Sequence, residues 1–153
     1  MNRFDTKVFN LDSFYSIYEE NKDKEMIMSA FLRLSDDEYR RTGNVNVNGE
    51  INDLYVLIDT IKDNLNTAQK SGYFFSYKIL DKISEEFDLL RFSNESILNI
   101  EVKKRVPDGG DSEIEEQLRR HKFVLSVLDK TVLPYAFVCD EKNSIKLMIT
   151  MNL

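Results

Sequence analysis

The sequence predicts an α/β protein with a mixed central sheet of about five strands, helices on both faces and a helical N-terminal arm. Apolar residues recur at helical spacing in the first 42 residues, again over about 50–69, and again over about 112–130. Three apolar or aromatic runs separated by polar turns lie between the helical patterns over 50–69 and 112–130. Two more such runs follow the second pattern. This order predicts a three-stranded meander and then a crossover helix that places the next strand parallel to the third.

The N-terminal arm is expected to cover residues 1–42, ahead of a core domain over residues 43–153. Asp12-Ser13 is predicted to cap a first short helix. The spacing of apolar residues over 26–34 predicts a second helix. A third is predicted to start at Ser35, because three acidic residues follow it and acids stabilise the positive end of a helix dipole.

An amphipathic helix is predicted from about Glu50 to Gln69, after a polar loop over residues 43–49. Its buried face is expected to carry Leu54, Leu57, Ile58, Ile61 and Leu65. Gly72 can adopt the left-handed conformation that ends a helix. The aromatic run over residues 73–80 then predicts the first strand.

A hairpin is predicted to supply the second and third strands. Two apolar runs, residues 86–92 and 97–104, flank a polar turn at about 93–96. Asp88 lies on the first of these strands, and the tripeptide Glu101-Val102-Lys103 lies on the second.

The remaining elements follow the clearest loop of the chain, residues 107–111. Ser112 and Glu115 have the spacing of a capping box at the start of a long helix that ends near Lys130. Its buried face is expected to carry Ile114, Leu118, Leu125 and Leu128. Two strands, residues 135–139 after Pro134 and residues 145–151, complete the sheet.

The composition is that of a globular protein. The 153 residues are 42% hydrophobic and 31% charged, which is typical of one folded domain rather than a disordered chain. No apolar run approaches the roughly 20 residues that cross a bilayer, and the N-terminal residues lack the apolar core of a signal peptide. We therefore expect a cytoplasmic protein that does not associate with membranes.

The chain has one cysteine and one histidine, so the usual zinc-site patterns are excluded. Cys139 is expected to be a small buried strand residue, and His121 a packed or half-exposed residue of the long helix rather than a catalytic one. Any bound metal should be a hard cation with oxygen ligands, which indicates Mg²⁺ or Mn²⁺.

The net charge of −6 counts against avid nucleic-acid binding by this domain alone. The charge is uneven, however, because residues 103–105 and 119–122 form two basic clusters. A nuclease within a larger assembly can leave most of the nucleic-acid affinity to its other parts.

The hairpin carries the most informative chemistry. Side chains alternate along a strand, so Glu101 and Lys103 share one face and Val102 takes the other. Asp88 comes opposite this pair if the turn spans residues 93–96. Two acids held together repel each other unless one is protonated or a cation binds. A divalent cation there can polarise a phosphoryl oxygen and lower the pKa of a bound water, and Lys103 can position that water or stabilise the developing charge.

This arrangement resembles the PD-(D/E)xK superfamily of metal-dependent nucleases. The resemblance covers residues 50–150, and it matches Asp88 to the superfamily acid of the second core strand and Glu101-Val102-Lys103 to the E-x-K of the third. It implies a restriction-endonuclease-like core and a metal site made by Asp88 and Glu101, with the carbonyl of Val102. Phe87 stands where many members have proline.

The resemblance also implies residues outside the hairpin. Glu50 is the candidate for the acid often found on the helix before the sheet, and Asp53 is its rival. Gln117 fits a glutamine that recurs on the helix after the third strand, where it would contact nucleic acid. Three basic residues are weaker candidates for contacts with the phosphate backbone: Lys104, Arg105 and Arg120.

The chain also looks like the nuclease segment that precedes helicase-type ATPase domains in some bacterial proteins. It contains no phosphate-binding G-x-x-x-x-G-K-[ST] loop, so we expect the motor beyond Leu153. A role in phage defence or genome maintenance follows from this likeness alone.

Three functional hypotheses remain open at this stage. The first is an Mg²⁺- or Mn²⁺-dependent nuclease acting on DNA, with RNA left open. The second is an inactive module of the same fold that binds nucleic acid or regulates an attached ATPase. The third is a protein-interaction domain whose acidic surface binds a partner. Each candidate residue also has a plain structural interpretation: Glu101 and Lys103 can be an exposed strand-edge ion pair, Glu50 and Asp53 ordinary first-turn acids, and the basic clusters solvated surface.

Overall fold

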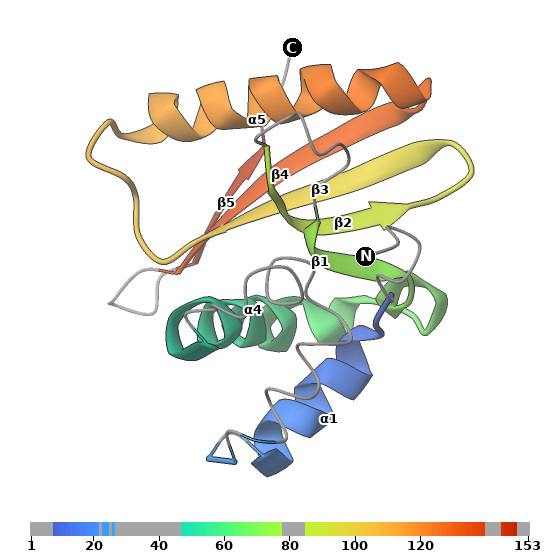
Figure 1. The fold of residues 1–153 in the computed structure, drawn as a ribbon, viewed down its shortest axis with the longest axis vertical. Coiled ribbons are helices and arrows are strands. Elements are labelled where there is room, and N and C mark those ends of the chain that lie inside the picture. Colours follow the sequence, from blue (N-terminus) through green and yellow to red (C-terminus); the bar gives the residue numbers. More distant parts are fainter. Residues whose placement is uncertain are drawn as a thin grey trace.

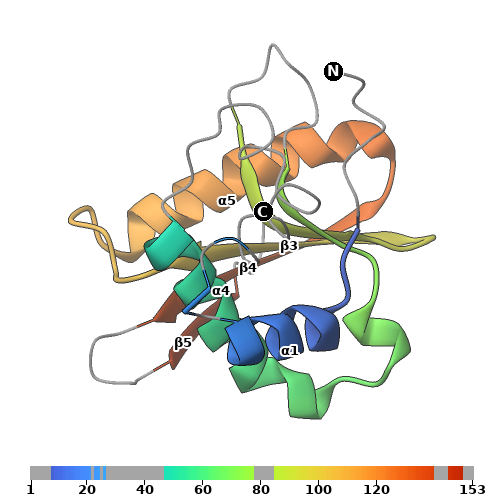
Figure 2. The same ribbon diagram turned by 60° about the horizontal axis from the view of Figure 1, so that its bottom comes forward.

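A computed structural model describes residues 8–21, 23–24, 26, 47–77, 85–139 and 145–149. A mixed sheet lies between helix α5 (Asp111–Leu125) on one face and helices α1 (Leu11–Asn21) and α4 (Val47–Ile61) on the other (Figure 1). The view in Figure 2 brings the α1 and α4 side forward. The prediction of an α/β fold with helices on both faces and an N-terminal helix is confirmed.

The sheet has five strands in the order β1-β2-β3-β4-β5: β1 (Tyr73–Tyr77), β2 (Phe87–Phe92), β3 (Ser96–Lys103), β4 (Thr131–Cys139) and β5 (Ile145–Ile149). The first three strands are antiparallel neighbours, β3 and β4 are parallel, and β4 and β5 are antiparallel. Helix α5 is therefore the crossover between two parallel strands, as the element order predicts.

The alternation of β3 assigns its side chains to the two faces. Ile100 packs in the core beneath α1 and α4, with Phe14 and Leu57. Ile97 packs on the opposite side, with Leu125 of α5. Glu101 shares the face of Ile97, because side chains two residues apart point the same way.

Both long helices bury one stripe of apolar residues, as their sequence periodicity predicts. The buried residues of α4 are Ile51, Leu54, Leu57 and Ile58, and those of α5 are Ile114, Leu118, His121 and Leu125. Leu128 was predicted to lie on the buried face of the second of these helices, but it is 39% exposed. The helix has already ended at Leu125, and Leu128 lies in the 3-10 turn η4 (Ser126–Leu128).

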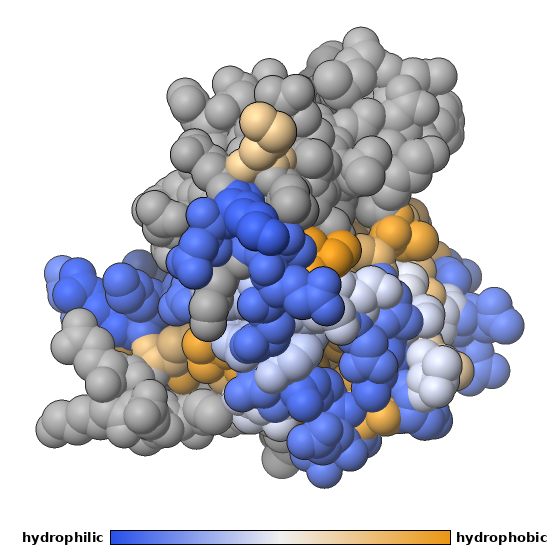
Figure 3. Space-filling view, turned by 90° about the horizontal axis from the view of Figure 1, so that it is seen from below, coloured by the Kyte–Doolittle hydropathy of each residue, from blue (hydrophilic) through white to orange (hydrophobic). Residues whose placement is uncertain are grey.

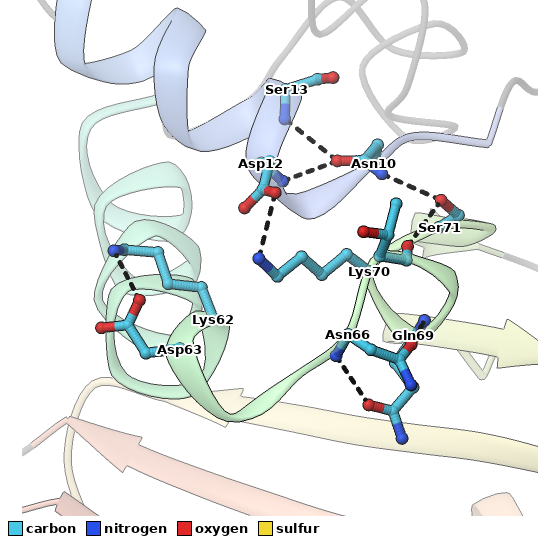
Figure 4. A network of polar contacts seen from close by, with 10 residues as sticks. Asn10, Asp12, Ser13, Lys62, Asp63, Asn66, Gln69, Lys70 and Ser71 are labelled. Carbon is cyan, nitrogen blue, oxygen red and sulfur yellow. Dashed lines mark hydrogen bonds and ion pairs between the residues drawn. The ribbon is translucent and has the colours of Figure 1, made fainter.

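Helix α1 begins one turn earlier than its predicted cap. Asn10, not Asp12-Ser13, is the N-cap: its Oδ1 accepts hydrogen bonds from the backbone N–H groups of Asp12 (2.8 Å) and Ser13 (3.3 Å) (Figure 4). Asn10 also donates to the hydroxyl of Ser71, and Lys70 pairs with Asp12 at 3.1 Å. The cap thus ties α1 to the segment before β1. Viewed from the side of α1 and α4, the described surface is mainly hydrophilic, with separated hydrophobic patches (Figure 3).

Helix α4 is displaced from the predicted range of 50–69. It already includes Val47, so the predicted loop over 43–49 is wrong from that residue on, and it ends at Ile61. Two 3-10 turns follow, η2 (Lys62–Asn64) and η3 (Ala68–Lys70), separated by an extended Leu65. Asn66 and Gln69 exchange side-chain to backbone hydrogen bonds of 2.9 Å, which replaces the helical ladder there. Gly72 has a positive φ of 84°, but it follows η3 rather than the long helix.

Helix α5 also starts differently from its predicted capping box. Gly110, with φ 74°, precedes the helix, and the side chain of Glu113, not that of Glu115, reaches back to the N–H of Gly109 at 3.1 Å. Ser112 donates to the carbonyl of Gly109. A serine and a glutamate thus make hydrogen bonds at the start of the helix, as predicted, but the glutamate is Glu113 and both bonds are to Gly109.

Strand β4 begins at Thr131, four residues before the predicted start, so Pro134 lies inside it. On the β3 side, Pro134 is paired with Asn99.

Several predicted segments lie outside the described residues. They are the helix over 26–34 apart from Met26, the helix from Ser35, the strand residues 78–80 and 150–151, and the turn 140–144. Within the part of the chain that the structure describes, no helix has the length and apolar character needed to cross a bilayer.

Candidate metal centre

Asp88 and Glu101 face each other across the β2–β3 hairpin. The register pairs Leu90 with Asn99 and Leu89 with Ile100, and its continuation places Asp88 opposite Glu101. Oδ2 of Asp88 accepts a 2.9 Å hydrogen bond from the backbone N–H of Val102, which fixes the aspartate against β3. The predicted pairing of the two acids is therefore present.

Both acids have raised pKa values, Glu101 being buried and Asp88 partly exposed. Glu101 is 1% exposed, and burial raises its pKa to about 7, partly offset by a hydrogen bond with Asp88 and by the charge of Lys103. Burial, and then the charge of Glu101, raises the pKa of Asp88 well above its ordinary value. Two adjacent carboxyls with raised pKa values repel each other when both are charged, so a shared proton or a cation would stabilise the pair.

Lys103 lies close to both acids. Its positive charge lowers the pKa of Asp88 and of Glu101, against the effect of burial. It follows Glu101 by two residues on the same strand, so it shares that face of the sheet. Asp88 and Lys103 keep part of their surface exposed whereas Glu101 is buried, so solvent reaches the group from the side of Asp88 and Lys103. Burial of Glu101 also rules out the alternative of an exposed strand-edge ion pair.

Helix α5 approaches both oxygens of Glu101. Gln117 donates a 3.2 Å hydrogen bond from Nε2 to Oε2 of Glu101. Nδ1 of His121, one turn later, lies 2.7 Å from Oε1. This second contact is short but is not aligned as a hydrogen bond, so Oε1 retains an unsatisfied lone pair.

His121 and Glu85 are functional candidates that sequence reasoning missed. His121 is fully buried, and burial lowers its pKa while the nearby charge of Glu85 acts in the opposite direction. Its Nε2 lies 3.0 Å from Oε2 of Glu85, whose Oε1 accepts from Nε of Arg120 at 3.1 Å. The spacing of Gln117 and His121 on one helix face was a usable signal, but nothing in the sequence links either residue to Glu85.

The other predicted residues do not join this group. The side chain of Glu50 lies outside the described residues. Asp53 lies on α4, on the opposite side of the sheet; burial raises its pKa, against the charge of Lys104. Burial, and then the charge of Asp53, raises the pKa of the Cys139 thiol to about 11. The thiol of Cys139 lies 3.9 Å from the backbone carbonyl of Asp53 and is only partly buried.

The predicted nucleic-acid contacts divide into two kinds. Lys104 and Arg105 are exposed directly after β3, beside the candidate centre. Arg120 is paired with Glu85 and lies 3.9 Å from Glu116. Gln117 is turned inward to Glu101 rather than outward to solvent.

The donor set fits Mg²⁺ or Mn²⁺. It consists of carboxylate oxygens, which these hard cations prefer, and Glu101 contributes a buried oxygen without a hydrogen bond. Across residues 8–21, 23–24, 26, 47–77, 85–139 and 145–149, no three Asp, Glu, His or Cys side chains converge as a complete ligand set. A cation would thus be held by Asp88 and Glu101, with the carbonyl of Val102 and with waters, as Mg²⁺ commonly is.

Comparisons of the chain with protein-family models, with curated proteins and with solved structures found no match.

Proposed function

We propose that this domain is an Mg²⁺- or Mn²⁺-dependent nuclease that hydrolyses phosphodiester bonds of DNA. The observation that carries the proposal is the opposed pair of Asp88 and Glu101, whose carboxyls have raised pKa values and lie beside Lys103. Two acids in contact, one of them buried, destabilise the fold through repulsion and desolvation, so stability alone does not account for the pair. Strongly perturbed titratable groups at one place are typical of functional sites.

The fold supports the same proposal. The acid lies on the second strand of the sheet, the E-x-K tripeptide lies on the third, and α5 crosses over to a parallel fourth strand. This is the arrangement that the resemblance to the PD-(D/E)xK superfamily and its restriction-endonuclease-like core implies.

Each residue of the centre has a distinct role in the proposed reaction. Asp88 and Glu101 would hold the cation, together with the carbonyl of Val102, and Glu50 would complete the ligands of a second ion. When bound, the cation supplies Lewis-acid chemistry and a more acidic water. Lys103 orients the attacking water or stabilises the negative charge that develops on the phosphate. Lys104 and Arg105, which are exposed directly after β3, would contact phosphates near the bond that is cut.

A cleavage assay tests the proposal directly. Purified protein is incubated with single- and double-stranded DNA and with RNA, in Mg²⁺, in Mn²⁺ and in EDTA. We expect metal-dependent cleavage of DNA that Asp88→Ala reduces by at least about a hundredfold, since a lost metal ligand removes several kcal/mol of transition-state stabilisation. Intact DNA under every condition, with metal binding unaltered by Asp88→Ala, would exclude the enzyme.

A second candidate function is an inactive module of the same fold that binds nucleic acid or regulates an attached ATPase. The observation that favours it is the set of contacts around Glu101. This side chain is buried and already contacts Asp88, Gln117 and His121. This function predicts DNA binding that needs no metal and survives Glu101→Ala, whereas the nuclease loses its metal in that variant.

Three wider expectations stay predictions. A helicase-type ATPase domain outside residues 1–153 is expected only from the resemblance, and so is a role in phage defence. A cytoplasmic location is expected for a protein that acts on DNA together with such a motor.

A further inference from the structure

The imidazole of His121 connects both acid-bearing strands to helix α5. Its Nδ1 lies 2.7 Å from Oε1 of Glu101 on β3, and its Nε2 lies 3.0 Å from Oε2 of Glu85, three residues before Asp88. The same ring therefore contacts the Glu101 carboxylate of the candidate metal centre and the Glu85 carboxylate just before β2.

The ring is held firmly in this position. It is 0% exposed, and the ring of Phe87 packs against it with centroids 4.5 Å apart. Nδ2 of Asn99 lies 3.4 Å from Nδ1 of the imidazole, and Arg120 anchors the second oxygen of Glu85 at 3.1 Å. A ring fixed on both edges can impose its own orientation on a carboxylate that contacts it.

We propose that His121 is a positioning residue that orients the Glu101 carboxylate for a divalent cation. Gln117 holds Oε2 and His121 confines Oε1, so both glutamate oxygens are placed from α5. Residues that contact metal ligands in this way tune metal affinity without touching the ion. The inference rests on the proposed function, because it assigns His121 to the same centre.

The simpler account is that His121 only fills space beneath the sheet. In that case its chemical identity matters to stability but not to metal affinity. Two substitutions separate the accounts, because the amide nitrogen of Asn takes the place of Nδ1 whereas that of Gln takes the place of Nε2. His121→Asn keeps a polar group at Glu101, and His121→Gln keeps one only at Glu85.

The first test is Mn²⁺ affinity, measured by calorimetry at one fixed pH. We expect His121→Gln to weaken binding roughly tenfold to a hundredfold and His121→Asn to stay close to the native value. Glu116→Gln is the matched control, since Glu116 lies on the same helix with its side chain 74% exposed. Equal affinities in native protein and both His121 variants, each shown to be folded by circular dichroism, would overturn the inference and leave the nuclease proposal intact.

The second test needs no substitution at His121. The chain contains one histidine, so ¹⁵N-histidine labelling gives a single imidazole with two nitrogen signals. We expect saturating Mg²⁺ to shift these signals in the native protein and not in Asp88→Asn. Mg²⁺ binding without a shift would contradict the role of His121, whereas the absence of any metal binding to native protein would contradict the proposed function itself.

Discussion

Glu101→Gln should stabilise the metal-free protein at neutral and alkaline pH. Burial raises the pKa of Glu101 from its ordinary value of 4.5 to about 7. A carboxyl with a raised pKa in the fold holds its proton more tightly there than in the unfolded chain. The contribution of this proton to the free energy of unfolding is complete below about pH 4.5 and is lost as the pH rises to about 7. Glutamine has no charge to bury, so the variant avoids this loss.

The magnitude follows from the size of the shift. The difference between 4.5 and about 7, at about 1.36 kcal/mol for each unit, amounts to roughly 3 kcal/mol above pH 7. For a domain of this size that corresponds to roughly 6–12 °C in Tm. The amide of glutamine can accept from Gln117 and donate to Nδ1 of His121, so the substitution leaves neither contact without a partner.

Urea denaturation in EDTA, at about pH 5 and about pH 8, measures the effect. We expect Glu101→Gln to unfold at higher urea than native protein at the higher pH, and the two to converge at the lower pH. For Glu116→Gln, the same change at an exposed site, the free energy of unfolding should differ from that of native protein by less than about 0.5 kcal/mol at both pH values. A native protein as stable as Glu101→Gln at both pH values would refute the reasoning that Glu101 is strained by its burial.

Three further outcomes are expected. Asn10→Ala should lower the free energy of unfolding by about 1 kcal/mol, measured by urea denaturation, because it removes the cap of α1. Leu118→Ala, at a fully buried site, should cost roughly 2–5 kcal/mol by the same measurement, whereas Phe123→Ala, at a site 79% exposed, should stay within about 0.5 kcal/mol. Mn²⁺ at a hundred times its Kd should stabilise native protein by about 2.7 kcal/mol in thermal unfolding and leave Asp88→Ala unchanged.

The hairpin could be predicted because its signals are local. A polar turn between two apolar runs fixes the register, and the register alone places Asp88 opposite Glu101. The element order likewise predicts the parallel crossover through α5. These features depend on patterns that repeat within a few residues.

The errors arise where several local solutions compete. Asn10, Asp12 and Ser13 are all good capping residues within four positions, and the contact of Asn10 with Ser71, 61 residues away, favours the first. Glu113 and Glu115 compete in the same way at the start of α5. Propensity ranks such residues equally, so tertiary contacts decide between them.

The surroundings of Glu101 could not be predicted for a different reason. The contact of His121 with Glu85 joins residues 36 apart in the chain, and Glu85 lies in an irregular segment before β2 with no periodic pattern. The burial of Glu101 depends on how α5 packs over the sheet, which the residues of β3 do not encode.

Anomalous diffraction from a crystal soaked in Mn²⁺ tests the metal centre most directly. The account predicts an anomalous peak between Asp88 and Glu101, with an oxygen of each carboxylate at about 2.1 Å from the ion. Manganese bound only elsewhere, with the two carboxyls still hydrogen-bonded to each other, would contradict it.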